Sequence, residues 1–327
     1  MGQTSACCRA CENDVSGEAA ATPTRNSAFV FIKPHAVTDQ VKELVRQRFE
    51  SAKIRVVREA QIDAETIDEK RLIDRHYGAI ASRAVLQQPS ELLVQEQAKA
   101  EFQSIFGVSW GDALSRGLVF NAAGAAERLG VKPLEISEMF DKLKRGVDQV
   151  KFGGGFYVGK VEDIYVVNGF YTRMRAKYTA PNTCIHYFEV EWDPAELSWQ
   201  KFRAEIIGAT NPLEAAEGSI RSKVFDQWSS LGLKEEPDTG DNGVHASASP
   251  FEGLAEKNNW IGVRMEEDPV GKALISAGIG EDTIQDWVSD PAVFFEGKKQ
   301  SLFDLLEDLD VTPCLEKAIK ISSTNSG

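Results

Sequence analysis

The amino-acid sequence predicts a mixed α/β (α+β) protein, because strand and helix patterns alternate near its start. Residues 28–33 are mostly apolar and rich in β-formers, which predicts a buried strand that ends at Pro34. Apolar residues then recur at helical spacing over 37–52, and 54–62 alternates as a second strand does. Residues 68–77 again have helical spacing. The predicted order is therefore β-α-β-α.

The rest of the chain contains further segments of both kinds. Residues 89–150 are predicted mainly as helices, and the glycines at 153–155 predict a hairpin turn or a hinge. Strands are predicted at 156–161, 164–167 and 185–192, and helices at 197–207, within 263–287 and at 301–309.

The composition excludes several classes of protein. The 327 residues include 37 Lys plus Arg and 50 Asp plus Glu, so the formal net charge is −13. Nucleic-acid binding needs clustered cations that neutralise phosphates, so this balance argues against a nucleic-acid partner. No apolar run approaches the roughly 20 residues that span a bilayer. Five cysteines, an odd number, favour a reducing cytoplasm over a disulfide framework.

Residues 1–26 are predicted to be a flexible tail with a lipidation pattern at its start. Gly2 is followed by small polar residues and by the pair Cys7 and Cys8, which suggests N-myristoylation and S-palmitoylation. Two acyl chains would attach the protein stably to a membrane. Ala6 stands where the pattern has Ser or Thr, so a tail with solvated cysteines is an open alternative. The predicted location is the cytoplasm, free or at a membrane.

Three short segments carry polar side chains beside regular elements. They are residues 31–37, residues 208–212 with 218–221 after them, and residues 242–249. Together they supply Lys33, Thr210, Arg221, Asn242 and His245.

These residue types suit phosphoryl transfer, in which the protein mainly positions the groups and stabilises charge. Lys33 and Arg221 can neutralise phosphate oxygens, and Thr210 and Asn242 can donate neutral hydrogen bonds. His245 can act as a nucleophile, because a neutral imidazole nitrogen is available near pH 7.

Two further side chains are expected to support His245. Ser247 and Glu256 could hold the imidazole in one tautomer. A carboxylate on the second ring nitrogen would raise the nucleophilicity of the first and stabilise the charged intermediate. The catalytic candidates are therefore His245, Lys33, Glu256 and Ser247.

The three segments resemble those of the nucleoside diphosphate kinase family. The family's FIKPDGV-type strand end is similar to residues 31–37, its GATNP segment is matched at 208–212, and its NxxHGSDS segment is similar to 242–249. The resemblance covers roughly residues 27–88 and 184–262, under half of the chain.

The resemblance implies a ferredoxin-like antiparallel sheet with flanking helices and a ping-pong reaction. A nucleoside triphosphate would phosphorylate His245, and the phosphohistidine would pass its phosphoryl group to a nucleoside diphosphate. Mg²⁺ would ride on the nucleotide phosphates, with no dedicated protein ligands. The nucleotide-binding residues that the resemblance implies are Lys33, Tyr77, Thr210, Arg221, Asn242 and Arg203. It also implies a homo-oligomer.

The sequence departs from the family at informative positions. Val85 stands where the family has an aromatic side chain that packs on the base. Ala204 stands where a second phosphate-binding arginine is expected, and Arg203, one place away, is the candidate substitute. His35 and Ala36 replace the family's Asp-Gly after Lys-Pro.

The resemblance also predicts the domain organisation. A kinase-like domain of residues 27–88 and 184–262 is interrupted by an inserted, mainly helical subdomain with a β-hairpin at 89–183, and a helical extension of 263–327 follows. Three functions are open: an active nucleoside diphosphate kinase, a catalytically weak nucleotide-binding scaffold, and an adaptor at a membrane or the cytoskeleton.

Overall fold

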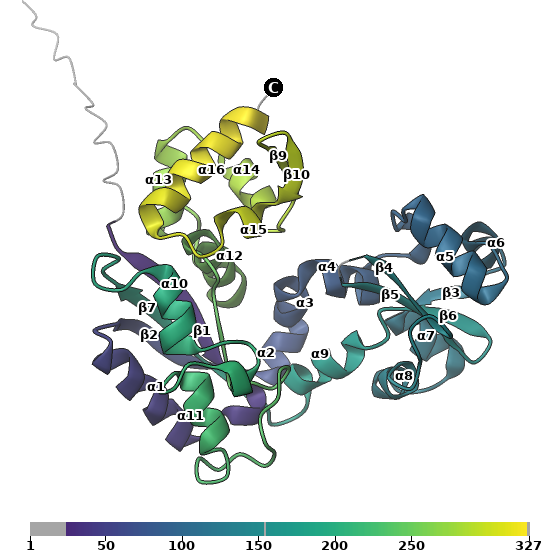
Figure 1. Ribbon diagram of the computed structural model, residues 1–327, viewed down its shortest axis with the longest axis horizontal. Helices are drawn as coiled ribbons and strands as arrows, with labels where there is room; N and C mark the ends of the chain where they lie inside the picture. The colour runs from purple at the N-terminus through teal and green to yellow at the C-terminus, as the bar shows by residue number, and fades with distance from the viewer. Residues whose placement is uncertain (1–23, 154, 326–327) are drawn as a thin grey trace, which may run out of the picture.

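The computed structural model describes residues 24–153 and 155–325, arranged as two four-stranded sheets with surrounding helices (Figure 1). The lipidation positions Gly2, Cys7 and Cys8 lie outside the described residues. Mixed α/β architecture is confirmed. Within the described ranges, no helix is both long and apolar enough to cross a membrane.

The main sheet is antiparallel and has the order β2-β7-β1-β8. Its strands are β1 (Asn26–Ile32), β2 (Arg55–Asp63), β7 (Cys184–Trp192) and β8 (Val244–Ala246). All seven residues of β1 are buried, as the apolar run predicts. The ferredoxin-like fold that the resemblance implies stays a prediction.

Helices cover both faces of the main sheet, because β1 presents apolar side chains to each. Ala28, Val30 and Ile32 belong to one core cluster, while Phe29 and Phe31 belong to another. On the first face lie α1 (Asp39–Ser51), α10 (Trp199–Lys201) with a π-helical turn over Phe202–Ile207, and α11 (Ile220–Asp226). On the second face lie α2 (Ala64–Glu69), α3 (Leu72–His76) and α12 (Pro250–Ile261).

The single helix predicted over 68–77 is broken in the structure. Arg71 adopts a left-handed backbone conformation with φ 50°, so α2 ends and α3 begins on its other side. The break places His76 at the last position of α3, where it packs against Phe31 and Trp260.

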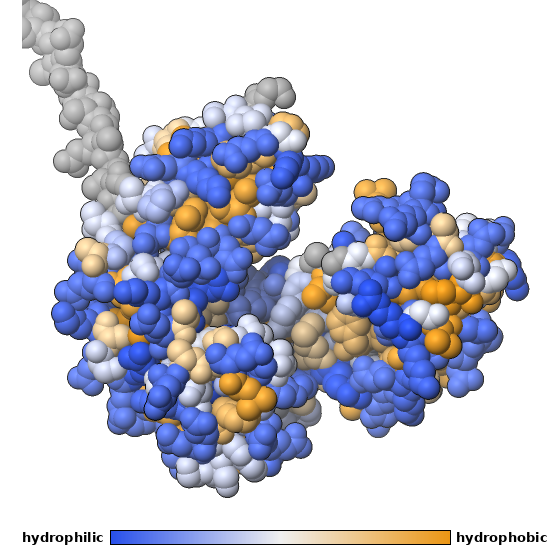
Figure 2. All heavy atoms as spheres, viewed as in Figure 1, coloured by the Kyte–Doolittle hydropathy of each residue, from blue (hydrophilic) through white to orange (hydrophobic). Residues whose placement is uncertain are grey.

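The second sheet lies within residues 119–167 and has the order β3-β6-β5-β4. Its strands are β3 (Val119–Asn121), β4 (Gln149–Gly153), β5 (Phe156–Val161) and β6 (Ile164–Val167). The surrounding helices are α4 (Gly78–Ala81), α5 (Glu96–Phe106), α6 (Trp110–Ser115), α7 (Ala122–Leu129), α8 (Pro133–Phe140) and α9 (Tyr171–Thr179). The space-filling view shows a hollow beside this lobe (Figure 2), and α9 joins the lobe to the main sheet, because Tyr178 packs in the core that contains Phe29 and Phe31.

This lobe differs from the expected helical subdomain with one hairpin. The β5–β6 hairpin is present, but β4 and β3 extend it to four strands, and β3 pairs with β6 in parallel. With three residues, β3 is too short to show the alternation that reveals a strand in a sequence.

The C-terminal extension is likewise not entirely helical. It contains α13 (Pro269–Ser276), α14 (Glu281–Trp287), the hairpin of β9 (Ala292–Phe295) and β10 (Lys298–Ser301), α15 (Leu302–Leu306) and α16 (Val311–Asn325). The hairpin was not expected within this helical extension. Its core includes Phe251 and Leu254 of α12, so the extension packs directly on a helix of the main sheet.

Candidate active site

Most of the residues singled out from the sequence line one cleft beside the main sheet. Its volume is about 910 Å³. The predicted site residues that line it are Lys33, Tyr77, Arg203, Thr210, Arg221, Asn242 and His245. Glu256 and Ser247 lie behind His245. Glu256 contacts His245 directly, and Ser247 contacts Glu256.

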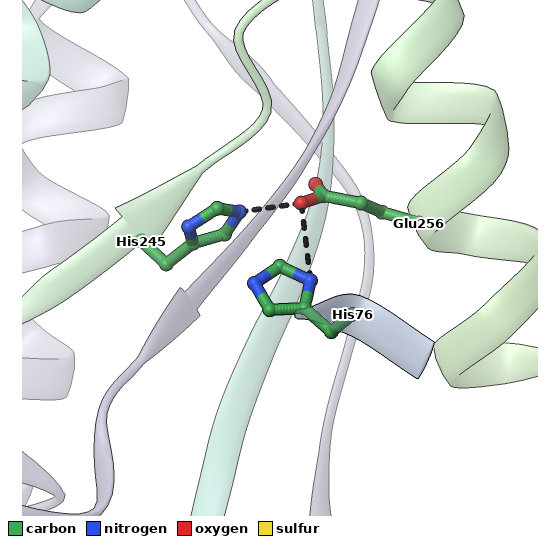
Figure 3. A group of neighbouring side chains, drawn as sticks. All are labelled: His76, His245 and Glu256. Carbon is green, nitrogen blue, oxygen red and sulfur yellow. Dashed lines mark hydrogen bonds and ion pairs between the residues drawn. The ribbon is translucent and has the colours of Figure 1, made fainter. Parts of the chain in front are cut away.

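His245 lies on β8 opposite Phe31 of β1, and its ring stacks on the Phe31 ring with centroids 4.8 Å apart. Nε2 of His245 lies 2.5 Å from Oε1 of Glu256, which projects from α12 (Figure 3). Oε2 of Glu256 accepts a 2.6 Å hydrogen bond from the Ser247 hydroxyl. Ser247 is itself fixed, because its Oγ accepts the backbone N–H of Phe29. This chain of contacts fixes the orientation of the imidazole.

The contact with Glu256 also determines which ring nitrogen can react. A carboxylate accepts hydrogen bonds, so Nε2 carries the proton and Nδ1 keeps its lone pair. Nδ1 points away from Glu256 (Figure 3). The His245 side chain is 20% exposed and that of Glu256 6%, so the accessible part of the ring is on the cleft side. The arrangement is that of an oriented nitrogen nucleophile.

Burial shifts the pKa of both partners toward their neutral forms. Desolvation, together with Lys33 and Arg221, holds the pKa of His245 well below its usual range. Desolvation raises the pKa of Glu256 to about 7, although His76 and Ser247 oppose the rise, so the carboxylate that accepts from Nε2 becomes the main form of Glu256 above pH 7. The imidazole of His245 is therefore neutral at pH 7, as nucleophilic attack requires.

Lys33 and Arg221 provide positive charge in the cleft. Lys33 follows β1 and donates to the carbonyl oxygen of Gly240 at 2.8 Å. Arg221, on α11, donates to the carbonyl oxygens of Gly208 and Val244 at 2.8 and 2.9 Å. Among the ion pairs of the described residues, none includes Lys33 or Arg221. Their charges are available for a polyanionic ligand.

The same burial lowers the pKa of both cations. Desolvation, and then the neighbouring Arg221, lowers the pKa of Lys33 to about 8. Desolvation, and then Arg203, lowers the pKa of Arg221 to about 10. A bound anion would oppose this penalty, because it would place a further negative charge beside the two cations.

Asn242 connects two of the three segments. Its Nδ2 donates to the carbonyl oxygen of Thr210 at 2.9 Å, and its buried Oδ1 has no hydrogen-bond partner among the described residues. Gly208, at the start of the Thr210 turn, has φ 97°, and a Cβ there would lie 2.5 Å from Oγ of Ser219. Glycine is therefore required for the turn that brings Thr210 into the cleft.

Arg203 lines the cleft but is already paired. Its Nη1 lies 2.6 Å from Oε1 of Glu307 and 2.7 Å from Oδ1 of Asp308. Both carboxylates come from the C-terminal extension and line the same cleft. Sequence reasoning missed them, because a contact between residues more than 100 positions apart leaves no local pattern.

The inserted residues also contribute to the cleft. Met174 of α9 lines it, and Lys177 of the same helix forms a 2.5 Å ion pair with Asp241. The hydroxyl groups of Tyr77 and of Tyr178 in α9 form a hydrogen bond. Val85 instead packs into the core of the inserted lobe. Residues 171–178 are basic and aromatic in the sequence, a pattern that suits a cover over a nucleotide, a partner surface or a solvated face, and Met174 of this stretch lines the cleft.

A second cavity, of about 510 Å³, lies on the other side of Glu256. His76, Glu252 and Glu256 line it, and Glu252 also lines the first cleft. Desolvation, and then Glu256, raises the pKa of Glu252 to about 8. The acidic face of α12 thus separates the two cavities.

Comparisons with known proteins give a weak structural likeness. No protein-family model matches the chain, and no curated protein matches its sequence. A nucleoside diphosphate kinase from Encephalitozoon cuniculi is similar at 14% identity and a TM-score of 0.34, over 73% of this chain and 90% of that one. An NDP kinase from Pyrobaculum aerophilum is similar at 17% identity and a TM-score of 0.33, over 75% and 98%. Because both TM-scores are below 0.5, these structures establish neither fold nor activity.

Proposed function

We propose that the protein is a nucleoside diphosphate kinase that works through a phosphohistidine at His245. The observation that carries the proposal is the oriented His245–Glu256 pair, with Nε2 and Oε1 2.5 Å apart, in a cleft that also holds Lys33 and Arg221, two cations with no ion-pair partner in the part of the chain that the structure describes. A nitrogen nucleophile beside two cations suits the terminal phosphate of a nucleotide.

In the first half-reaction, the Nδ1 lone pair of His245 attacks the γ-phosphorus of a nucleoside triphosphate. A bond from phosphorus to Nδ1 forms, the bond from phosphorus to the β–γ bridging oxygen breaks, and the nucleoside diphosphate leaves. The Nε2 proton stays on the ring, where the Glu256 carboxylate stabilises the new positive charge. In the second half-reaction, a terminal phosphate oxygen of another nucleoside diphosphate attacks the phosphorus, and the phosphorus–nitrogen bond breaks.

The other cleft residues would bind and position the nucleotide. Lys33 and Arg221 neutralise the phosphate oxygens during transfer. Thr210 and Asn242 offer hydrogen bonds, and Oδ1 of Asn242, which accepts none from the described residues, suits a sugar hydroxyl. Tyr77 lines the wall toward the inserted lobe. Mg²⁺ enters as part of the nucleotide substrate, on its phosphates.

A second candidate is a nucleotide-binding scaffold that transfers phosphate poorly. The pairing of Arg203 with Glu307 and Asp308 favours it, because a phosphate contact from Arg203 would compete with two carboxylates. Val85, packed in the inserted lobe, also supplies no aromatic surface to a base in the cleft.

Labelling with [γ-³²P]ATP and Mg²⁺ separates the two functions. The kinase predicts an acid-labile phosphoprotein that His245→Ala abolishes and that added nucleoside diphosphate discharges. His186→Ala is the matched control, because His186 also contacts a glutamate, Glu59 at 2.6 Å, but does not line the cleft. Nucleotide binding by calorimetry without labelling would favour the scaffold, and equal labelling of the His245→Ala variant would refute the proposed nucleophile.

A further inference from the structure

His76, His245 and Glu256 bring two imidazoles and a carboxylate together behind the cleft. They come from the end of α3, the middle of β8 and the interior of α12 (Figure 3). One metal-binding atom of each lies within 4.8 Å of those of the other two. The side chains of His76 and Glu256 are nearly inaccessible, at 7% and 6% exposure.

The two contacts that Oε1 of Glu256 makes are different in kind. At 2.5 Å it accepts the proton of His245 Nε2, whereas Nδ1 of His76 lies 3.4 Å away. The indole Nε1–H of Trp260 donates to this Nδ1 at 3.3 Å, so Nδ1 is an acceptor. The single lone pair of Nδ1 therefore accepts this N–H, and an ion bound to Nδ1 would displace it. Nδ1 of His76 and Oε1 of Glu256 are nevertheless close enough to share one ion.

We propose that this cluster binds a Zn²⁺ ion through Nδ1 of His76, Nε2 of His245 and a carboxylate oxygen of Glu256. Zinc–ligand distances of about 2.1 Å and tetrahedral angles separate ligand atoms by about 3.4 Å. The His76–Glu256 contact already has this length, at 3.4 Å. The distance between Nε2 of His245 and Oε1 of Glu256 would increase by about 0.9 Å from 2.5 Å. Because the ligand atoms all lie within 4.8 Å of one another, no other distance between them would shorten by more than about 1.4 Å.

The donor set distinguishes zinc from the magnesium that accompanies a nucleotide. Two imidazole nitrogens and one carboxylate are typical zinc ligands, whereas Mg²⁺ prefers oxygen and keeps several waters. Three protein ligands leave one tetrahedral position, which water from the 510 Å³ cavity lined by His76 and Glu256 can fill. Zinc and magnesium would therefore occupy different places.

Zinc binding would change the reactive histidine. The ion replaces the proton on Nε2 of His245, and that proton leaves to solvent. The hydrogen bond to Glu256 is lost, so the carboxylate no longer stabilises positive charge on the ring. Inhibition of phosphoryl transfer by zinc rests on the proposed function, whereas binding of the ion does not.

Calorimetric titration with ZnCl₂, in the absence of nucleotide, tests the site. The full chain carries Cys7→Ser, Cys8→Ser and Cys11→Ser, so that these thiols do not compete for the ion. We expect one zinc ion per chain, and we expect Co²⁺ in its place to give the intense visible absorption of a tetrahedral site.

Single variants identify the ligands. His76→Gln and His245→Gln should each weaken zinc binding at least tenfold. His186→Gln is the matched control and should bind zinc as the parent does, because His186 is equally buried, at 8% exposure, and also contacts a glutamate. Far-UV circular dichroism and a thermal melt show whether each variant is folded.

Three results would overturn the site: no saturable zinc binding, parental affinity in folded His76→Gln, or an equal loss in His186→Gln. If neither histidine variant folds, the Co²⁺ spectrum of the parent decides, and weak octahedral absorption rejects the site. Saturable zinc binding in a chain that is never phosphorylated would reject the proposed function and leave the site intact.

Discussion

Nη1 of Arg203 lies 2.7 Å from Oδ1 of Asp308, and this contact links the wall of the cleft to the C-terminal extension. Glu307 accepts a second bond from the same nitrogen at 2.6 Å. The backbone N–H of Asp308 also donates to the carbonyl oxygen of Ala248, within the 242–249 segment that carries His245. The two carboxylates therefore occupy the partner position that a phosphate would take on Arg203.

Removing these carboxylates is expected to strengthen nucleotide binding. In the double variant Glu307→Gln with Asp308→Asn, Arg203 is free to contact phosphate, and the Michaelis constant for the nucleotide should fall about three- to tenfold, since about 1 kcal/mol separates a paired from a free surface charge. Steady-state kinetics measures this.

The control removes two acidic charges elsewhere. Asp282→Asn with Glu316→Gln, both exposed on the C-terminal extension, should leave the Michaelis constant unchanged. An equal fall in both double variants would indicate a general effect of net charge and contradict a specific contact at Arg203.

The Glu256 carboxylate is expected to speed formation of the phosphohistidine. Glu256→Gln keeps an acceptor for Nε2 of His245 but removes the negative charge that stabilises the phosphorylated ring. The rate of phosphoenzyme formation in a single turnover should fall about 10- to 100-fold, the usual cost of losing such a partner. Glu59→Gln, at the other His–Glu contact, should leave the rate unchanged, and a comparable loss there would point to folding instead.

The sequence predicted the polar residues of the cleft better than it predicted the residues that the inserted lobe and the C-terminal extension contribute to its walls. Lys33, Thr210, Arg221, Asn242 and His245 could be grouped because each stands in a short segment with a recognisable residue order at a turn. Short segments fix local geometry, and the antiparallel pairing of β1 with β8 then brings the first and the third segments together.

The walls depend on contacts that a sequence does not display. Met174 reaches the cleft because α9 is tied to the main body by the Arg175–Asp74 and Lys177–Asp241 ion pairs. Each pair joins positions far apart in the chain, so its partners cannot be identified from local spacing. The break at Arg71 was also missed, because nothing in the helical pattern of 68–77 requires a left-handed residue.

A buried ion pair is expected to hold the C-terminal extension on α12. Nζ of Lys257 lies 2.5 Å from Oδ2 of Asp268, and both side chains are 1% exposed. Asp268→Asn leaves a buried, uncompensated ammonium group, which should lower the free energy of unfolding by about 3–5 kcal/mol. Urea denaturation measures this. The exposed Asp286→Asn should change it by less than about 0.5 kcal/mol, and equal small effects would show that the pair contributes little.

Lys33 is expected to set the alkaline limb of the activity profile. Its lowered pKa of about 8 has burial as the main cause, and the charged groups that face it are Arg221, Asp241, Lys177 and Asp238. Below pH 8 the ammonium is charged and can bind phosphate, and as pH rises through 8 the charge is lost. Because kcat/KM reports the free enzyme, it should fall above pH 8 with an apparent pKa near 8. In Lys33→Arg the guanidinium stays charged, so this limb should disappear even if the overall rate is lower. A limb that persists near pH 8 in the arginine variant would assign the titration to another group.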